Sequence, residues 1–153
     1  MTRLEKSIEI KATPKKVWEM LAFDRMPEWM SDWKSAAFTS EVRTPEDKCR
    51  LGASAHVTEK HGEFDLEITE SLENEKITAL SKGKYKYPWM GGQRVTMTVT
   101  YTLKPVEEGT ILTYAMDHEL LLRFGGQLQP LGKGYLEKGI EKSLNNLKSI
   151  LEK

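Results

Sequence analysis

Three titratable side chains in the second half of the chain have the chemistry to exchange a proton with a bound molecule. His118 is two residues from both Met116 and Leu120, so in a strand these three share an apolar face. Burial there would lower the pKa of His118 and leave a neutral imidazole that acts as a base or a hydrogen-bond donor. Tyr101 and Tyr114 would add hydroxyl groups. A buried histidine is more often a hydrogen-bonded core group than a catalytic one. We therefore treat His118, Tyr101 and Tyr114 as candidate catalytic residues only.

A hairpin must form to bring these side chains onto one surface. Residues 94–103 alternate between apolar residues and threonines, and a second run of alternating residues follows the turn at Val106–Gly109. The predicted cross-strand pairs are Tyr101–Leu112, Val99–Tyr114, Met97–Met116 and Val95–His118. We predict that the methionines and tyrosines line a pocket, because methionine adapts to irregular ligands and tyrosine adds a hydroxyl to apolar area. The valines are interpreted as core.

The spacing of the histidines and the cysteine indicates neither a metal site nor a catalytic nucleophile. Cys49, His56 and His61 show none of the usual zinc-ligand pairings, so we expect no metal and no cofactor. Cys49 lies among charged residues in a predicted turn without a partner base, which favours a surface thiol. The carboxylates of residues 63–67 alternate with apolar residues and are predicted to face solvent.

A run of lysines and tyrosines superficially resembles a nucleic-acid surface. Lysines at 82, 84 and 86 alternate with Gly83, Tyr85 and Tyr87. In a strand this alternation sends lysines to solvent and tyrosines inward, so the two kinds of residue cannot act on one nucleic acid together. We therefore assign Tyr85 and Tyr87 to a pocket wall.

The elements that position these residues follow from periodicity. Residues 4–10 alternate as a strand, and Thr13-Pro14 begins a helix that is predicted to end near Asp24. A second short helical segment, Met26–Trp33, carries Trp29 and Trp33 on one face, and both are candidate ligand-binding residues. Between residues 36 and 120, turn signals at 44–47, 61–62, 73–75, 90–92 and 106–109 separate six predicted strands.

Residues 128–151 form the last predicted element, a long amphipathic helix. Gly139 costs this helix about 1 kcal/mol relative to alanine, which either space for a ligand or close approach of a strand would explain. In the first case Tyr135 and Gly139 look into the cavity. Glycine-rich loops carry large apolar residues that either frame an entrance or pack against each other. These residues are Trp89, Met90 and Phe124.

The order of these elements resembles the START-like (SRPBCC) superfamily, in particular its polyketide cyclase/dehydrase branch and the neighbouring coenzyme Q-binding proteins. The resemblance rests on Ile8–Pro14 running into Val17-Trp18, on Pro27-Glu28-Trp29, and on Gly109-Thr110 opening a strand that closes in Glu119-Leu120. It implies an α+β helix-grip fold over residues 1–153: a seven-stranded curved antiparallel sheet around a long C-terminal helix, with two short helices after strand one. It also implies a deep apolar cavity between helix and sheet.

Composition restricts the class of partner. The chain has 153 residues, the usual size of one domain, and its 23 basic and 23 acidic residues cancel. This neutrality argues against nucleic acid. The N-terminus lacks an apolar signal segment, a single cysteine cannot form an internal disulfide, and no apolar run is long enough to cross a bilayer. We therefore expect a cytoplasmic protein without integral membrane association.

Three functions are compatible with these observations. The favoured hypothesis is binding or carriage of a small hydrophobic molecule, such as a lipid, an isoprenoid quinone or a polyketide-like compound, because no catalytic constellation is visible. A cyclase or dehydratase that uses His118, Tyr101 or Tyr114 in the same cavity is the second. A protein-interaction module using the Trp89 loop and the long helix is the third.

Overall fold

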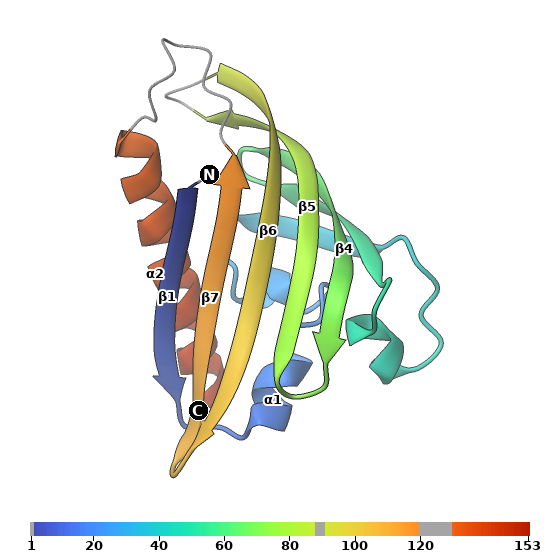
Figure 1. Cartoon of the computed structure of the whole chain (residues 1–153), viewed down its shortest axis with the longest axis vertical. Coiled ribbons are helices and arrows are strands. Elements are labelled where there is room, and N and C mark those ends of the chain that lie inside the picture. Colours follow the sequence, from blue (N-terminus) through green and yellow to red (C-terminus); the bar gives the residue numbers. More distant parts are fainter. Residues whose placement is uncertain (1, 88–90, 120–129) are drawn as a thin grey trace.

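A curved antiparallel sheet of seven strands in the order β1-β7-β6-β5-β4-β3-β2 is the framework of the molecule (Figure 1). The computed structural model describes residues 2–87, 91–119 and 130–153. Its elements are β1 (Thr2–Ile10), α1 (Pro14–Glu19), η1 (Met26–Glu28), β2 (Trp33–Phe38), η2 (Pro45–Cys49), β3 (Ser54–Glu59), β4 (Gly62–Leu72), β5 (Lys76–Tyr87), β6 (Gly91–Val106), β7 (Gly109–Glu119) and α2 (Pro130–Leu151).

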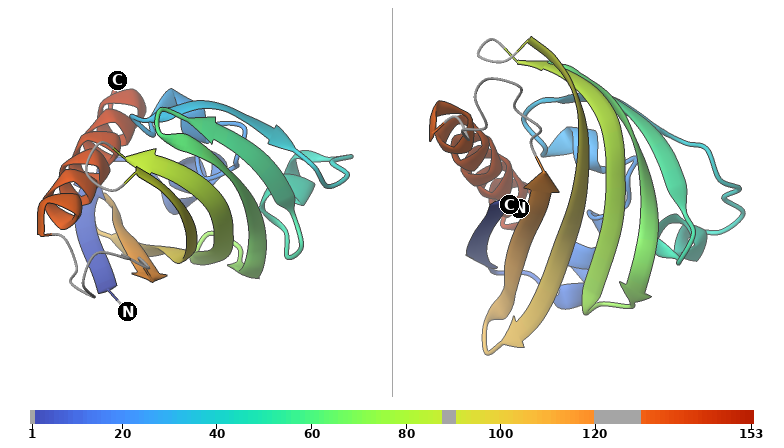
Figure 2. Two further views of the ribbon diagram at one scale, coloured as in Figure 1. Left: turned by 90° about the horizontal axis from the view of Figure 1, so that it is seen from above. Right: turned by 45° about the horizontal axis from the view of Figure 1, so that its top comes forward.

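The helix α2 lies across the open side of the curved sheet, next to β1, while α1 and η1 lie further along the same concave side (Figure 2). Ile140, Leu144 and Leu147 of α2 are buried there. Such burial is the main source of stability for an amphipathic helix. The predicted helix-grip fold, with six strands after the short helices, is confirmed.

The short helices end earlier than the sequence pattern predicts. Thr13 caps α1 by accepting a hydrogen bond from the Lys16 backbone N–H at 3.3 Å, as predicted, but the helix ends at Glu19 and not near Asp24. Tight turns follow, with the Leu21 N–H donating to the Trp18 carbonyl at 3.0 Å. The second segment is only the single 3₁₀ turn of η1. Both corrections have one reason: the chain turns sharply to bury residues 20–23 and Trp29.

The hairpin between β6 and β7 differs in register from the prediction. Val106 pairs with Gly109 across a two-residue turn, so Tyr101 lies opposite Tyr114, not opposite Leu112. The other pairs are Val99–Met116 and Met97–His118. The predicted register is therefore wrong by two residues, because the turn lies one residue later than assumed. A shift of two preserves the face of each side chain, so the predicted inward face is unchanged.

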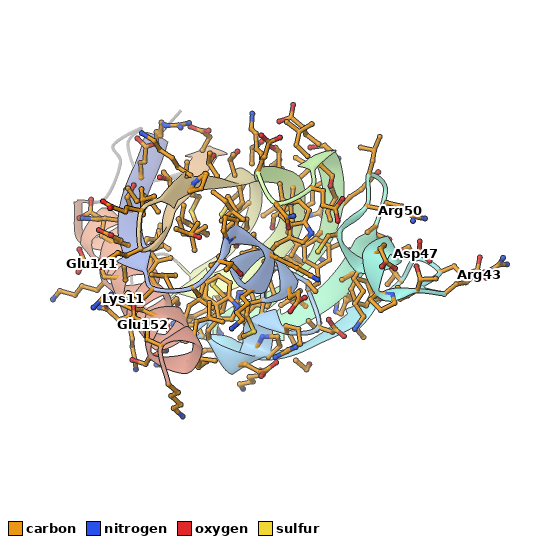
Figure 3. The ribbon with its side chains drawn as sticks, turned by 90° about the horizontal axis from the view of Figure 1, so that it is seen from below. Lys11, Arg43, Asp47, Arg50, Glu141 and Glu152 are labelled. Carbon is orange, nitrogen blue, oxygen red and sulfur yellow. The ribbon has the colours of Figure 1, made fainter. Side chains whose placement is uncertain are left out.

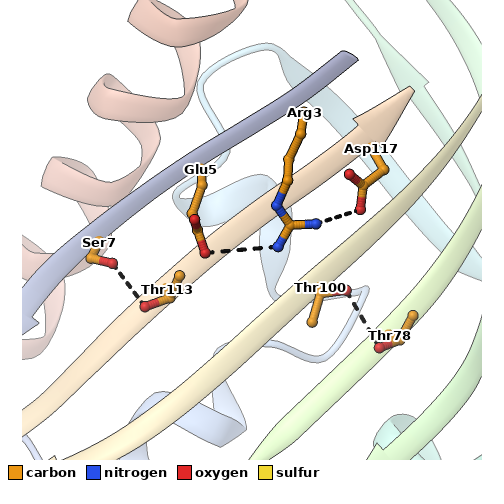
Figure 4. A network of polar contacts seen from close by, with 7 residues as sticks. All are labelled: Arg3, Glu5, Ser7, Thr78, Thr100, Thr113 and Asp117. Atoms are coloured by element: carbon orange, nitrogen blue, oxygen red, sulfur yellow. Dashed lines mark hydrogen bonds and ion pairs between the residues drawn. The ribbon is translucent and has the colours of Figure 1, made fainter. Parts of the chain in front are cut away.

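The convex face of the sheet is polar (Figure 4). Ser7 and Thr113 share a hydrogen bond of 2.8 Å between β1 and β7, and Arg3 bonds Asp117 at 2.7 Å between the same strands. Thr78 and Thr100 approach at 3.5 Å between β5 and β6. Such contacts at an exposed surface contribute little to the free energy of folding. They follow from the strand alternation that places apolar residues on the opposite face.

The loop between β2 and β3 corrects a second prediction. It contains η2, whose Asp47 carboxylate accepts hydrogen bonds from the backbone N–H groups of Arg43 at 2.9 Å and Thr44 at 3.1 Å (Figure 3). This capping turns Cys49 inward, where its side chain is 7% exposed. Burial raises the pKa of the Cys49 thiol to about 12. Cys49 is therefore a buried thiol and not the predicted surface thiol.

The end of α2 is fastened to the end of β1. The Lys11 backbone N–H donates to the Glu152 carboxylate at 3.0 Å, and the Lys148 ammonium group donates to the Glu9 carbonyl at 2.8 Å (Figure 3). Lys6 and Glu141 form an ion pair of 3.1 Å further along the same two elements. These contacts fix the position of α2 over the concave face.

Replacing Gly83 with alanine is expected to destabilise the protein by roughly 1–3 kcal/mol. A Cβ atom on Gly83 would lie 2.3 Å from the Phe64 Cβ and 2.5 Å from the Glu63 carbonyl oxygen, and neither atom belongs to a flexible side-chain end. The strands β4 and β5 must therefore separate locally. Urea unfolding followed by circular dichroism measures the loss. An unchanged unfolding midpoint would contradict this close approach.

Candidate functional site

A small apolar cavity lies between the η1 region and the concave face of the sheet. Its volume is about 60 Å³, enough for a few water molecules. Two tyrosine hydroxyls, one serine and one carboxylate are the polar groups among its otherwise apolar walls. The lining residues are Phe23, Met26, Met30, Trp33, Glu59, Phe64, Leu66, Ala79, Ser81, Met97, Val99, Tyr101 and Tyr114.

A second cavity of about 70 Å³ lies beside the first, against the helix α2. Ser31, Asp32, Leu136, Gly139, Ile140 and Ser143 line it together with Met30, Trp33 and Glu59. The last three side chains also line the first cavity. They therefore form the partition between the two spaces, and their movement would join the sheet-side cavity to the helix-side cavity.

Glu59 is the main site residue that the sequence analysis missed. It ends β3 and follows Ala55 and Val57 at period two, and both of these are fully buried. This alternation was the available signal, because it assigns Glu59 to the inward face. Desolvation, reinforced by the nearby Asp32, raises the pKa of Glu59 to about 8. At neutral pH the carboxyl group therefore holds its proton and can donate a hydrogen bond.

Asp32 reaches the same place from the loop before β2. Its carbonyl accepts a hydrogen bond of 2.8 Å from the Lys60 N–H, which ties this loop to the end of β3. The preceding residue, Ser31, donates its N–H to the Ser143 hydroxyl of α2 at 3.0 Å. The two bonds hold Asp32 between sheet and helix. Within the described part of the chain, neither Asp32 nor Glu59 forms an ion pair.

Tyr101 and Tyr114 form an aromatic pair at the base of the first cavity. Their ring centroids are 5.0 Å apart in an edge-to-face arrangement, and each side chain is 3% exposed. The Tyr101 hydroxyl also lies 3.9 Å from the Met26 sulfur. Burial raises the pKa of both phenols, and the Glu59 charge contributes to the rise at Tyr114. Both hydroxyls therefore stay protonated at neutral pH.

Ser81 is a buried polar residue in the wall of the first cavity. It follows Ile77 and Ala79 on the inward face of β5, lines the first cavity, and is 3% exposed. Its side chain makes no hydrogen bond to any residue that the structure describes. Since buried polar groups are nearly always hydrogen-bonded, water or a ligand is the expected partner.

The structure gathers some of the residues predicted to contact a ligand. Trp33, Met97, Tyr101 and Tyr114 line the first cavity, and Gly139 lines the second. Trp29 and Met116 lie in the core and do not line either cavity. Trp89, Met90 and Phe124 fall outside the described residues, as do the side chains of Tyr85, Tyr87, His118 and Tyr135.

Gly139 leaves room that an alanine would partly fill. The nearest atom to a Cβ built on it is an Asp32 carboxylate oxygen at 3.9 Å, an ordinary contact distance. Close approach of a strand is thus not the reason for this glycine within the described residues. Gly139→Ala should stabilise the protein by up to about 1 kcal/mol through helix propensity. A higher thermal midpoint in calorimetry would confirm this, whereas a lower one would reveal hidden crowding.

Over residues 2–87, 91–119 and 130–153, no group of three or more histidine, cysteine, aspartate or glutamate side chains is arranged to hold a metal ion. None of the helices in these ranges is both long and apolar enough to cross a membrane.

Comparisons with known proteins agree with the fold. A conserved protein from Geobacillus kaustophilus superposes with a TM-score of 0.74 at 18% identity, covering 99% of this chain and 95% of that chain. A START superfamily protein from Mycobacterium smegmatis gives 0.72 at 15% identity, with coverages of 98% and 97%. A protein from Mesorhizobium loti gives 0.72 at 18% identity, with coverages of 99% and 97%.

Sequence comparison is more specific. No curated protein matches the chain. Residues 1–152 match the family described as polyketide cyclase/dehydrase and lipid transport. Because this match spans the whole sheet and the long helix, the chain belongs to the polyketide cyclase/dehydrase and lipid transport family.

Proposed function

We propose that the protein binds a small, largely apolar molecule in the space between the concave face of the sheet and α2. The observation that carries the proposal is the pair of adjoining cavities, whose walls are mainly apolar and contain a few convergent polar groups. Ligand sites have this composition, because apolar area supplies affinity while polar groups fix orientation. Family membership supports the same function.

The dimensions of the cavities imply that binding moves side chains. Pockets that bury drug-sized ligands measure roughly 300–1,000 Å³, more than either cavity offers. The partition of Met30, Trp33 and Glu59 is the obvious element to move, because its displacement joins the two spaces. Methionine is well suited to this, since its unbranched side chain adapts to many shapes. A ligand would then reach from Tyr114 at the sheet to Gly139 on the helix.

Native mass spectrometry of the purified protein, followed by denaturing extraction, tests the proposal. We expect a stoichiometric apolar molecule that co-purifies, or one that is captured from mixtures of lipids, quinones and polyketides. Val99→Trp is the matched blocking variant, because its side chain is directed into the first cavity. It should abolish capture while preserving the circular dichroism spectrum. Absence of any bound molecule after all incubations would contradict the proposal.

A further inference from the structure

We propose that the ligand carries a positively charged amine, which the paired carboxylates of Asp32 and Glu59 bind where the two cavities meet. This inference rests on the proposed function and adds a chemical class to it. Both carboxylates line the helix-side cavity, and Glu59 also lines the sheet-side cavity. An apolar body in the first cavity would therefore place its polar end beside both acids.

Within the described residues, neither acid has the paired cation that usually accompanies a carboxylate drawn out of water. Carboxylates that are drawn out of water are normally paired with lysine, arginine or a metal ion. The ion pairs of the described residues involve other acids, and no lysine or arginine lines either cavity. The charge of the whole chain is zero, so this negative site is a local feature. A ligand cation would supply the missing partner.

Among the described residues that line the two cavities, the charged group that faces Glu59 is another acid, Asp32. Asp32 lies beside it from the loop before β2, and the Tyr101 and Tyr114 hydroxyls lie on β6 and β7. Residues of α2 that line the adjoining cavity are Leu136, Gly139, Ile140 and Ser143, none of which is charged. A carboxylate or phosphate ligand would be repelled by the Asp32 charge and would meet no lysine or arginine among the described lining residues. Trp33, which lines both cavities, offers an aromatic surface of the kind that attracts ammonium groups.

Ser81 is an independent sign that this space receives a polar ligand. Ser81 is 3% exposed and lines the same cavity as Glu59, yet its hydroxyl has no hydrogen-bond partner among the described residues. A hydroxyl accepts a hydrogen bond from an N–H group as readily as it donates one. It can therefore share an ammonium group, or bind a second polar group of the same ligand.

Binding of an ammonium group should release a proton from the site. The free protein holds a proton on Glu59 at neutral pH, because burial and Asp32 raise the pKa of this carboxyl to about 8. A neighbouring cation favours the ionised carboxylate and lowers the pKa again. The proton then leaves as the amine enters, so affinity for the amine should rise with pH up to about the pKa of free Glu59.

Three probes with the same apolar chain test the inference: octylamine, octan-1-ol and octanoic acid, each titrated by calorimetry below its aggregation concentration. We expect octylamine to bind at least about tenfold more tightly than octan-1-ol at pH 8, a difference of about 1.4 kcal/mol. Octanoate should bind more weakly than the alcohol. Repeating the octylamine titration near pH 7 in buffers of different ionisation enthalpy should reveal release of close to one proton.

Variants identify the groups responsible. Glu59→Gln and Asp32→Asn keep the side-chain shapes, so each should reduce the preference for the amine and leave binding of octan-1-ol unchanged. Glu67→Gln is the matched control, because Glu67 is an exposed glutamate on the opposite face of the sheet. Equal binding of all three probes would overturn the amine inference while leaving the proposed pocket intact. Failure of all three to bind would overturn the amine inference, and the proposed function falls with it if mass spectrometry also captures no molecule.

Discussion

Replacing Trp29 with alanine should destabilise the protein by about 3–5 kcal/mol, a large part of the stability of a small domain. The Trp29 side chain is 1% exposed, so its removal leaves a cavity in the core. Its indole N–H donates to the Met20 carbonyl at 2.9 Å, and its own carbonyl accepts a hydrogen bond of 3.2 Å from Asn146 of α2. Trp29 thereby joins the turn after α1, the η1 segment and the long helix.

Urea unfolding monitored by far-ultraviolet circular dichroism measures this effect without relying on tryptophan fluorescence. Trp29→Phe separates the two contributions: it retains much of the packing but leaves the Met20 carbonyl without its donor, at an expected cost of about 1–2 kcal/mol. Leu51→Ala is the control for truncation at an exposed site, because Leu51 is 68% exposed. Equal losses for the Trp29 and Leu51 truncations would refute the central position of this indole.

Replacing Glu59 with glutamine should remove a decline in stability as the pH rises. The carboxyl has its ordinary pKa of 4.5 in the unfolded chain and a pKa of about 8 in the folded protein. Between these values the folded state binds more protons than the unfolded state, so wild-type stability falls by at most about 1.4 kcal/mol per pH unit. Glutamine has no such proton. The variant should therefore be more stable than the wild type at about pH 9 and similar near pH 4.5.

Unfolding free energies measured from about pH 4 to about pH 9 test this expectation. His56 complicates the wild-type curve, because a hydrogen bond with Asp65 raises its pKa and its contribution is also lost as the pH rises. Both proteins contain His56, so subtracting the Glu59→Gln curve from the wild-type curve removes this contribution. Glu67→Gln should leave the pH profile unchanged. Parallel curves for wild type and Glu59→Gln would show that Glu59 is solvated like an ordinary glutamate.

Much of the fold was predictable because the alternation of apolar and polar residues shows which face of each strand is buried. The threonines of β6 mark its convex face, and Tyr101 and Met97 mark its concave face. The two-residue error in the β6–β7 register does not change which side chains face inward, since the side-chain period is also two. The amphipathic period of α2 likewise identified the only long element able to cover the sheet.

Local pattern is a poorer guide where the chain turns. Alternation or helical period cannot say how far a short helix continues, and α1 ends at Glu19 because tertiary burial of the following residues outweighs continued helical bonding. Cys49 was misplaced for a similar reason. Its charged neighbours predict exposure, but the cap formed by Asp47 turns the thiol inward.

The sequence by itself thus determined the strands and the long helix, their inward faces and the apolar character of the space between sheet and helix. The meeting of Asp32 with Glu59 was decided only by the tertiary structure. These residues are separated by β2, the loop after it and nearly all of β3, and they come together because the Lys60 N–H binds the Asp32 carbonyl at 2.8 Å. The side of the sheet on which a side chain lies depends on its position within its own strand, and the sequence pattern shows that position. The electrostatic coupling of two residues depends on a distance across the fold, which no local pattern contains.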